Sequence, residues 1–453
     1  MNEGKLSLKV KLGYGVCDIG GNLYFTSIGF WLLIFLTDTV GLAAGLAGLV
    51  VAIGKIWDAV TDPMVGYLSD RTKSRWGRRR PYILFGSIPL FIAMIIMFTN
   101  PQLESQTSLF IWGIVAFCLL STAITLVNIP YNSLTPELTP DYHERTSLNG
   151  YRFVFAIIGT LTGAGIALPI INGFSNRNMG FTVMGATFGA LMMVSAMITF
   201  FSIREPAQRV IPTEKFFKTY LTVFKNKPYV LILIAYALNL TFLTIIMGAA
   251  VYYFKYIHND ESKTTLGLLI LLVTALAFIP ISVLASKKMG KKIVYGGGML
   301  VFAVGIMILF FFGHHSGINF TYGILALVGA GQGFTMALPY SIVADAVEYD
   351  YLLTGERREG AFFGIWTFAT KVGSALALAI SGWILAMTGY IPDVAQSEIA
   401  KLGIRLLVGP VPALFCLLGV VFVYLYPINE KRYQEILDQI REMEAKGLKG
   451  IGN

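Results

Sequence analysis

The chain has 453 residues, of which 55% are hydrophobic and only 13% are charged, and its formal net charge is +9. An ordinary soluble domain is about 25% charged, so this composition excludes a typical soluble globular protein. It predicts an all-α integral membrane protein.

The hydrophobic residues are gathered into long runs. A helix that spans the ~30 Å hydrocarbon layer needs about 20 largely apolar residues. Twelve runs meet this length and predict twelve transmembrane helices, at roughly residues 13–36, 42–69, 82–99, 108–133, 147–171, 179–202, 229–256, 264–286, 292–313, 319–346, 360–388 and 404–426. The first run contains Asp18 and Asn22 and lacks a cleavage pattern, so we interpret it as a span and not as a cleaved signal.

Basic residues fall in alternate connections between the predicted spans. If both termini are cytoplasmic, the inner segments hold 27 of the 35 lysines and arginines, and the densest cluster lies in residues 71–80. Cytoplasmic loops carry such a basic excess. The net charge therefore predicts a multi-pass protein of the cell (inner) membrane with both termini inside, and it needs no nucleic-acid partner.

A long hydrophilic connection divides the spans six and six. We expect an N-terminal six-helix bundle over 1–202, a cytoplasmic linker over 203–228, a C-terminal bundle over 229–427 and a cytoplasmic tail over 428–453. The stretch NIPYNSL in the fourth span resembles ALPYSIV in the tenth. Two parallel six-helix repeats are typical of a class of transporters whose substrate site lies between the halves.

Polar side chains inside the predicted spans are the candidate functional residues. An ionisable residue at the centre of a span costs about 2.5–3.5 kcal/mol and is normally paired and turned inward. Lys55, Asp58 and Asp62 share one helical face. A Lys55–Asp58 ion pair and hydrogen bonds between helices from Asn128 and Asn132 are purely structural alternatives. One lysine cannot neutralise two buried carboxylates, however, so the aspartate pair favours a bound hard cation.

Several stretches resemble a known transporter family. GYLSDRTKSRWGRRRP is similar to the loop that follows the second span in the major facilitator superfamily. More narrowly, LGYGVCDIGGN, TDTVGL, KIWDAVTDPMVGYLSDRTKSRWGRRRPYILFG, NIPYNSLTPELT and FATKVGSALA resemble the glycoside-pentoside-hexuronide cation symporter family, which includes the melibiose carrier. The resemblance extends from near residue 10 to near residue 430 and implies a major-facilitator-type fold.

The resemblance also implies a site. The positions that match the family's cation ligands are Asp58, Asp62, Thr61 and Thr125, with the two aspartates as metal ligands if the ion is Na⁺. The positions that match its substrate ligands are Asp18, Asn128, Asn132, Arg152, Thr367 and Lys371. Thr61 and Asn128 depart from the melibiose carrier, which has Asn and Asp there, and this leaves both the ion and the sugar open. Four aromatic residues are candidates to stack on a sugar ring, namely Tyr24, Phe25, Tyr131 and Trp366.

The basic loop after the second span has two explanations. Its charge sets topology in any case. The superfamily resemblance implies in addition that Asp70, with neighbouring residues such as Arg75 and Arg78, joins the two halves at the cytoplasmic face. Asp345 and Glu348, at the inner end of the tenth span, are the expected acidic partners.

The predicted function is secondary active transport, as symport of a sugar or glycoside with Na⁺ or H⁺ by alternating access, in a monomer surrounded by membrane lipid and without a cofactor. A hexuronide or a lysolipid-like amphiphile is the alternative solute. A membrane enzyme is not expected, because the four histidines lie in loops or near span ends and no His-x-x-x-His, nucleophile elbow or Walker loop occurs. A non-transporting sensor is a further alternative. The tail contains no recognisable signalling domain, which argues against it.

Overall fold

A computed structural model describes residues 6–139, 142–205, 223–355 and 358–445, and in these ranges it contains helices and no strands. Eleven helical segments of this part are long and apolar enough to cross a membrane. The first predicted span is helical as well, but it is divided into short segments, so it is not one of the eleven. The predicted count of twelve and the all-α class agree with this arrangement.

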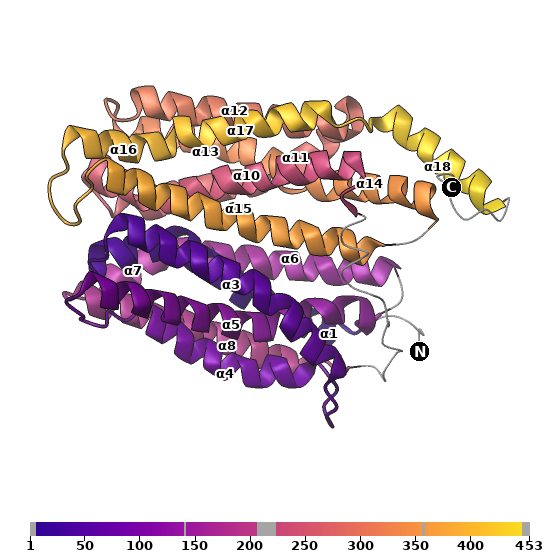
Figure 1. The fold of residues 1–453 in the computed structure, drawn as a ribbon, viewed down its shortest axis with the longest axis horizontal. Helices are drawn as coiled ribbons and strands as arrows, with labels where there is room; N and C mark the ends of the chain where they lie inside the picture. The colour runs from indigo at the N-terminus through magenta and orange to yellow at the C-terminus, as the bar shows by residue number, and fades with distance from the viewer. Residues whose placement is uncertain (1–5, 140–141, 206–222, 356–357, 446–453) are drawn as a thin grey trace.

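The helices before residue 203 form one group, which is drawn in indigo to magenta in Figure 1. The first span consists of two α-helices and two π-helical segments. The elements are α1 (Leu8–Gly15), α2 (Cys17–Thr26), η1 (Ser27–Leu32), η2 (Phe35–Thr39), α3 (Ala44–Arg71), α4 (Arg80–Met97), α5 (Gln106–Leu138), α6 (Tyr142–Gly165), α7 (Ala167–Asn172) and α8 (Arg177–Ser202).

The helices after residue 226 form the second group, drawn in red to yellow. Two predicted spans are interrupted where a proline starts a new helix, Pro339 in the tenth and Pro410 in the twelfth, because proline cannot donate the backbone hydrogen bond of a continuing helix. The elements are α10 (Lys227–Tyr252), η3 (Tyr253–Ile257), α11 (Lys263–Met289), α12 (Lys291–Phe312), α13 (Ile318–Met336), α14 (Leu338–Thr354), α15 (Glu359–Met387), α16 (Glu398–Val408), α17 (Pro410–Leu425) and α18 (Glu430–Ala445).

Most of the predicted linker, residues 206–222, lies outside the described residues, as does the end of the predicted tail, residues 446–453. The described part of the tail forms α18, which buries Ile436, Ile440 and Met443 and packs against α14. The tail therefore begins as an amphipathic helix on the second group.

The two groups meet along α3 and α15, with further contacts between α6 and α11 and between η1 and α10. Small residues allow the closest approach, as is common between membrane helices. A Cβ atom added to Gly382 of α15 would lie 2.4 Å from the carbonyl oxygen of Ala44 at the start of α3, and one added to Gly48 would lie 2.9 Å from that of Leu378. Glycine is thus required where these helices touch.

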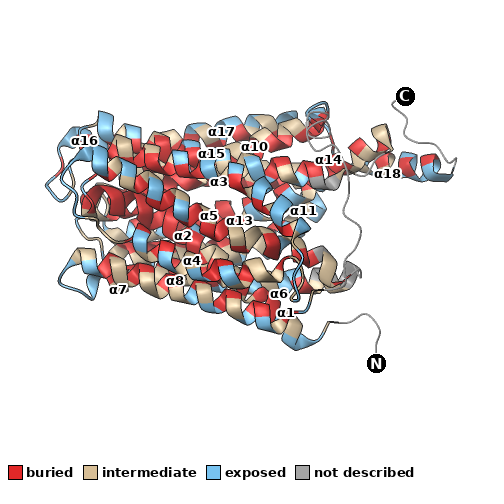
Figure 2. Cartoon of the chain, turned by 60° about the horizontal axis from the view of Figure 1, so that its bottom comes forward, coloured by how far each residue is buried: buried red, intermediate tan, exposed pale blue. Residues whose placement is uncertain are grey.

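The bundle has two ends. We call the end that carries the α3–α4 connection, the start of α12 and α18 the basic end, and the other the opposite end (Figure 1). The outer faces of the helices carry exposed residues (Figure 2), including large apolar side chains such as Phe201, which is 74% exposed, and Met387, which is 86% exposed. Such a surface suits a hydrocarbon environment and not water.

Candidate functional site

A pair of carboxylates lies at the contact between α3, α5 and α15. Asp58 and Asp62 are one helical turn apart on α3. The hydroxyl oxygen of Thr125, on α5, lies 2.9 Å from Asp58 Oδ1 and 3.0 Å from Asp62 Oδ1. Both helices therefore direct polar groups to one point, as predicted for a cation site.

Lys371 of α15 supplies the positive charge of this cluster. Its Nζ lies 2.9 Å from Asp58 Oδ2 and forms an ion pair with Asp62 as well. It also lies 3.3 Å from the backbone carbonyl oxygen of Asp58. The sequence assigned Lys371 to the solute, whereas the structure places it against the predicted cation ligands. Lys371 is thus the ion-pair partner of both carboxylates, and Lys55 is a second buried lysine that interacts electrostatically with them.

In the part of the chain that the structure describes, Thr61 and Lys55, on the same helix, do not bond to the carboxylate oxygens of Asp58 and Asp62. Thr61 donates its hydroxyl hydrogen to the Asp58 carbonyl oxygen at 3.2 Å, so it bonds to the backbone of its own helix. Lys55 is buried, and its Nζ lies 5.1 Å from the centre of the Tyr24 ring. Among the described contacts no ion pair joins Lys55 to Asp58, so the alternative of a simple intrahelical pair is wrong for this structure.

A second polar cluster surrounds Asp18 of α2. Arg152 of α6 donates from Nε to Asp18 Oδ2 at 2.7 Å and from Nη2 to Oδ1 at 3.2 Å. It also donates to Asn132 Oδ1 at 2.6 Å and to the Thr135 hydroxyl at 3.0 Å. The Tyr131 hydroxyl donates to Asp18 Oδ2 at 2.5 Å. Three of the predicted solute ligands, with one predicted aromatic residue, thus form one network.

Asn128 lies on α5 between the two clusters. Positions 125, 128 and 132 share one face of α5, because residues three and four apart are neighbours on a helix. A Cβ atom on Gly21 of α2 would lie 3.4 Å from Asn128 Oδ1, so the amide stands beside α2. Within the described part of the chain its side chain makes no hydrogen bond. It therefore retains free donors and acceptors for a ligand.

Of the remaining predicted solute residues, Thr367 and Trp366 lie on α15, whereas Tyr24 and Phe25 lie on α2. Thr367 is exposed and donates to the backbone oxygen of Phe363 at 3.0 Å. Trp366 is buried and stacks on Tyr236, with ring centres 4.1 Å apart, and its indole nitrogen has no partner among the described residues. Tyr24 lies against Lys55, and Phe25 is exposed.

At the basic end, the ion pairs given for the described residues lie within one group of helices or the other. Arg79 pairs with Asp70 at 2.6 Å and with Glu137 at 2.7 Å. Arg78 pairs with Glu137 and with Glu205, the latter at 3.6 Å. Arg75 instead lies over the Trp76 ring, 4.5 Å from its centre.

The expected pairing of these arginines with Asp345 is wrong for this conformation. Asp345 of α14 faces the start of α12, and both of its oxygens accept from Lys291 at 2.7 Å. Glu348 follows one turn later on α14. The nearest base to Asp345 belongs to its own group of helices, which is why no arginine of residues 71–80 reaches it.

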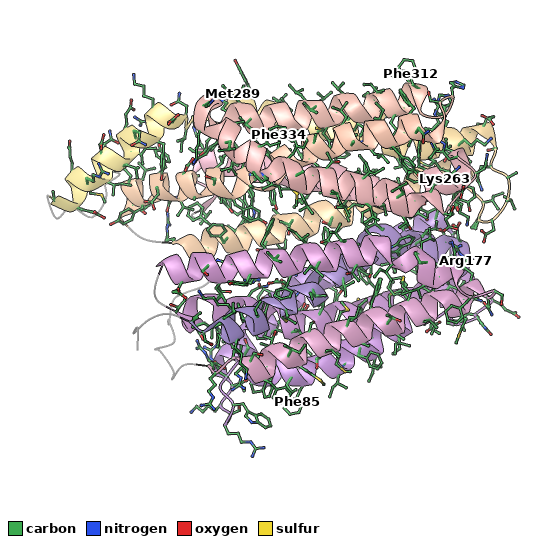
Figure 3. The ribbon with its side chains drawn as sticks, turned by 180° about the vertical axis from the view of Figure 1, so that it is seen from behind. Phe85, Arg177, Lys263, Met289, Phe312 and Phe334 are labelled. Carbon is green, nitrogen blue, oxygen red and sulfur yellow. The ribbon has the colours of Figure 1, made fainter. Side chains whose placement is uncertain are left out.

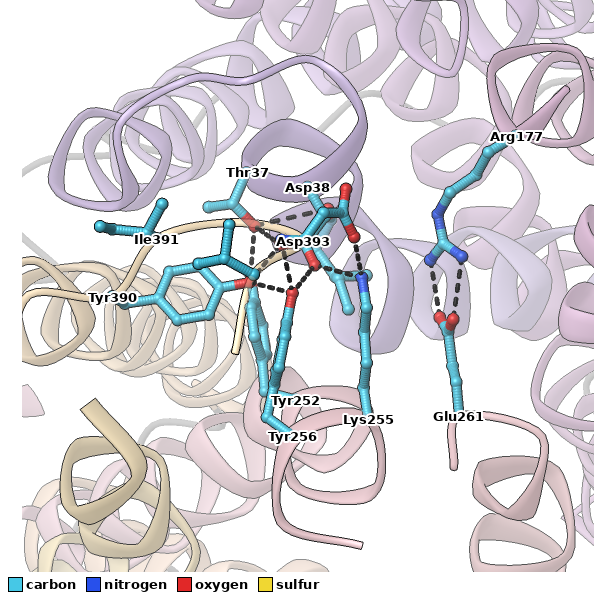
Figure 4. A network of polar contacts seen from close by, with 12 residues as sticks. Thr37, Asp38, Arg177, Tyr252, Lys255, Tyr256, Glu261, Tyr390, Ile391 and Asp393 are labelled. Carbon is cyan, nitrogen blue, oxygen red and sulfur yellow. Dashed lines mark hydrogen bonds and ion pairs between the residues drawn. The ribbon is translucent and has the colours of Figure 1, made fainter. Parts of the chain in front are cut away.

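At the opposite end a polar network joins the two groups (Figure 4). The Asp38 side chain, at the end of η2, is completely buried and pairs with Lys255 at 2.6 Å, which also contacts Asp393 at 2.6 Å. Tyr256 and Tyr390 donate to Asp38 at 2.6 and 2.5 Å. We call these five residues the Asp38 network.

Two further contacts cross between the groups beside the Asp38 network. Arg177, at the start of α8, makes two hydrogen bonds to Glu261 at 2.8 and 2.6 Å. The Thr37 hydroxyl lies 2.7 Å from that of Tyr252. The sequence analysis did not identify these contacts as functional, although Asp38 belongs to the family-like stretch TDTVGL. The groups are therefore tied by charge at the opposite end and not by the predicted pairs at the basic end.

Comparison with known proteins agrees with this architecture. A protein-family model described as MFS/sugar transport protein matches residues 13–430. The glucuronide carrier protein homolog of Escherichia coli (strain K12) is 30% identical over 446 residues, which cover 97% of this chain and 96% of that protein. An inner membrane symporter of the same organism is 27% identical over 453 residues, covering 99% and 97%.

Solved structures show the same fold at low identity. A bacterial homolog of the human lysosomal transporter Spinster has a TM-score of 0.70 at 13% identity, covering 95% of this chain and 97% of that one. A bacterial homologue of the iron transporter ferroportin has a TM-score of 0.65 at 15% identity, covering 93% and 99%. The family-model match and the relatives, in turn, confirm the expected relationship to sugar transporters and indicate a transporter in place of an enzyme. The chain belongs to the MFS/sugar transport protein family.

Proposed function

We propose that this chain carries a sugar or glycoside together with Na⁺ or H⁺, by alternating access. The observation that carries the proposal is the Asp58–Asp62 pair with Thr125 and Lys371, since it combines two inward-facing carboxylates and a hydroxyl with a base from the other group of helices. Hard cations favour carboxylate and hydroxyl oxygens. A relative named as a symporter and another named as a glucuronide carrier homolog support the same assignment.

In the proposed cycle the coupling cation replaces the Lys371 ammonium at the carboxylates. Both carry one positive charge, so the exchange preserves the local charge while freeing the lysine. The cation would then be held by Asp58, Asp62 and the Thr125 hydroxyl, which come from one group of helices only. Cation binding thereby removes an ion pair between α3 and α15.

The proposed solute position is the face of α5 that carries Asn128 and Asn132, next to Asp18 and Arg152. Carboxylate, amide and guanidinium groups together supply the donors and acceptors that sugar hydroxyls require. The opposite charges of Asp18 and Arg152 compensate each other at 2.7 Å, which favours a neutral sugar. A hexuronide is the second candidate, because a freed Lys371 would add a positive charge beside this position.

The proposed orientation places the basic end in the cytoplasm, in accordance with the distribution of lysine and arginine. The Asp38 network then closes the outer side in the conformation described here. An outward-open state requires the Asp38–Lys255 and Arg177–Glu261 pairs to separate.

The experiment is uptake of a panel of labelled sugars and glycosides into proteoliposomes, with an imposed Na⁺ or H⁺ gradient in turn. One charge that crosses about 100 mV supplies roughly 2.3 kcal/mol, which sustains a solute gradient on the order of 50-fold at about 1.4 kcal/mol per decade. We expect one of the two gradients to drive accumulation of at least one neutral sugar. Symport is refuted if neither gradient accelerates uptake of any solute in the panel.

A further inference from the structure

A large cavity at the basic end has no part in the proposed transport site. Its volume is about 710 Å³, and it is lined by the end of α11, the start of α12, and parts of α14, α17 and α18. All of these elements belong to the second group of helices. The Asp58 and Asp18 clusters, by contrast, are built mainly on the first group.

Lysines dominate the charge of this cavity. Lys287, Lys291 and Lys292 line it, against the acidic residues Asp345 and Glu430. Lys291 is already paired with Asp345 at 2.7 Å. Lys292 donates only to the backbone oxygen of Tyr426 at 2.9 Å, and in the described part of the chain no carboxylate pairs with it or with Lys287. Two lysine charges therefore remain available to an anion.

The start of α12 adds to the positive potential. The chain turns there at Gly290, whose φ of 86° lies in the region that favours glycine, and no side chain caps α12. The first turn of a helix presents unbonded backbone N–H groups and the positive end of the helix dipole. Lys291 and Lys292 lie in this turn, so backbone and side-chain donors face the same cavity.

The wall beyond the lysines is apolar and faces away from the bundle. Ile293 and Leu300 of α12 and Tyr424 of α17 line the cavity and are exposed, Tyr424 at 77%. Met289, the last residue of α11, also lines the cavity and lies at the end of the bundle near α18 (Figure 3). The lysine-lined part of the cavity is thus continuous with an exposed apolar surface on α12 and α17.

We propose that this cavity binds an anionic phospholipid. The phosphate contacts Lys287, Lys292 and the first turn of α12, and the acyl chains lie along Ile293, Leu300 and Tyr424. Basic pockets between membrane helices on the cytoplasmic side recognise acidic headgroups in this way. A free phosphate would use the lysines but not the apolar wall, which is why a lipid is favoured over a soluble anion.

The test uses the full-length chain purified in neutral detergent. Binding of phosphatidylglycerol, phosphatidylcholine and inorganic phosphate is followed by native mass spectrometry and by the thermal unfolding midpoint. We expect phosphatidylglycerol to bind and to raise the midpoint, and the Lys287→Gln/Lys292→Gln variant to bind it at least 5-fold more weakly. A control with the same charge change at the same end is Lys73→Gln/Lys431→Gln, which alters two exposed lysines outside the cavity and should bind as the wild type does.

Three results would overturn the proposal: equal binding of phosphatidylcholine, an equal midpoint rise with inorganic phosphate, or an equal loss of binding in the control. If the glutamine variant does not fold, Lys287→Gln alone, at an exposed position on the last turn of α11, replaces it. Lys287→Arg/Lys292→Arg should retain binding, because arginine keeps the charge and the donors. Loss of binding in this arginine variant, with folding intact, would also contradict a phosphate contact.

Discussion

Replacing Lys371 with glutamine tests the central exchange of the proposed mechanism. The ammonium lies 2.9 Å from Asp58 Oδ2 and is paired with Asp62, so it occupies the position that a coupling cation would take. A hydrogen bond to a charged group contributes about 1.5–3 kcal/mol. If the cation must displace at least one such bond, Lys371→Gln should tighten cation binding by roughly 10- to 150-fold at about 1.4 kcal/mol per decade.

The assay is equilibrium binding of Na⁺ to the purified protein, measured by isothermal titration calorimetry. If the wild type binds no Na⁺, proton uptake by the detergent-solubilised protein is compared instead. The variant should also lose accumulation against a gradient, since the ion pair between α3 and α15 is gone in every state. Lys401→Gln is the matched control, because the ion-pair partner of Lys401 among the described residues is the exposed Glu398 at the opposite end. Unchanged or weaker cation binding in Lys371→Gln would refute the exchange.

Three further predictions address the other parts of the site. Asp62→Asn should abolish gradient-driven accumulation of solute in proteoliposomes while leaving solute exchange. The control variant Asp438→Asn, on the exposed face of α18, should change neither. Full accumulation in the Asp62→Asn variant would remove Asp62 from the cation site. Arg152→Lys loses the two-nitrogen contact with Asp18 and should raise KM for the solute about 10-fold or more with cation binding unchanged, so a wild-type KM would exclude Arg152 from the solute site. Lys255→Gln leaves the buried Asp38 without its ion pair, at a cost of about 3–5 kcal/mol. Spin labels at positions 102 and 259, on a cysteine-free background, should then report longer distances, as expected for an open outer side. An unchanged distance distribution would show that the Asp38 network does not hold this side closed.

The spans could be predicted because hydrophobic continuity is a local property of the sequence. Which side chains meet across helices is not local, and here the sequence was less informative. Spacing placed Asp58 and Asp62 on one face of α3, but nothing in it shows that Lys371, 309 residues after Asp62, faces them. The preference of Asp345 for Lys291 over an arginine has the same origin, since it depends on how α14 packs on α12.

The Asp38 network illustrates this limit most clearly. Its members come from η2, η3 and the connection after α15, and each looks like an ordinary residue at a span end. The π-helical segments of the first span were not predicted either, because most of their length, residues 28–36, is an uninterrupted run without a polar side chain. Such segments are frequent at functional sites, and here Asp38 itself lies in η2.

The positions of the ion pairs suggest how cation binding is coupled to movement in the proposed cycle. Lys371 ties α15 to the α3 carboxylates, and the same two helices touch through Gly48 and Gly382 nearer the opposite end. Once a cation replaces Lys371, the contacts that still hold the outer side include the Asp38 network, the neighbouring Thr37–Tyr252 and Arg177–Glu261 contacts, and this glycine contact. Loss of the Lys371 ion pair lowers the free energy needed to separate the two groups on the outer side. Cation binding therefore favours the outward-open state, so this state should bind the cation more tightly. By linkage, a solute that favours the same state raises the affinity for the cation, and the cation raises the affinity for the solute by the same factor.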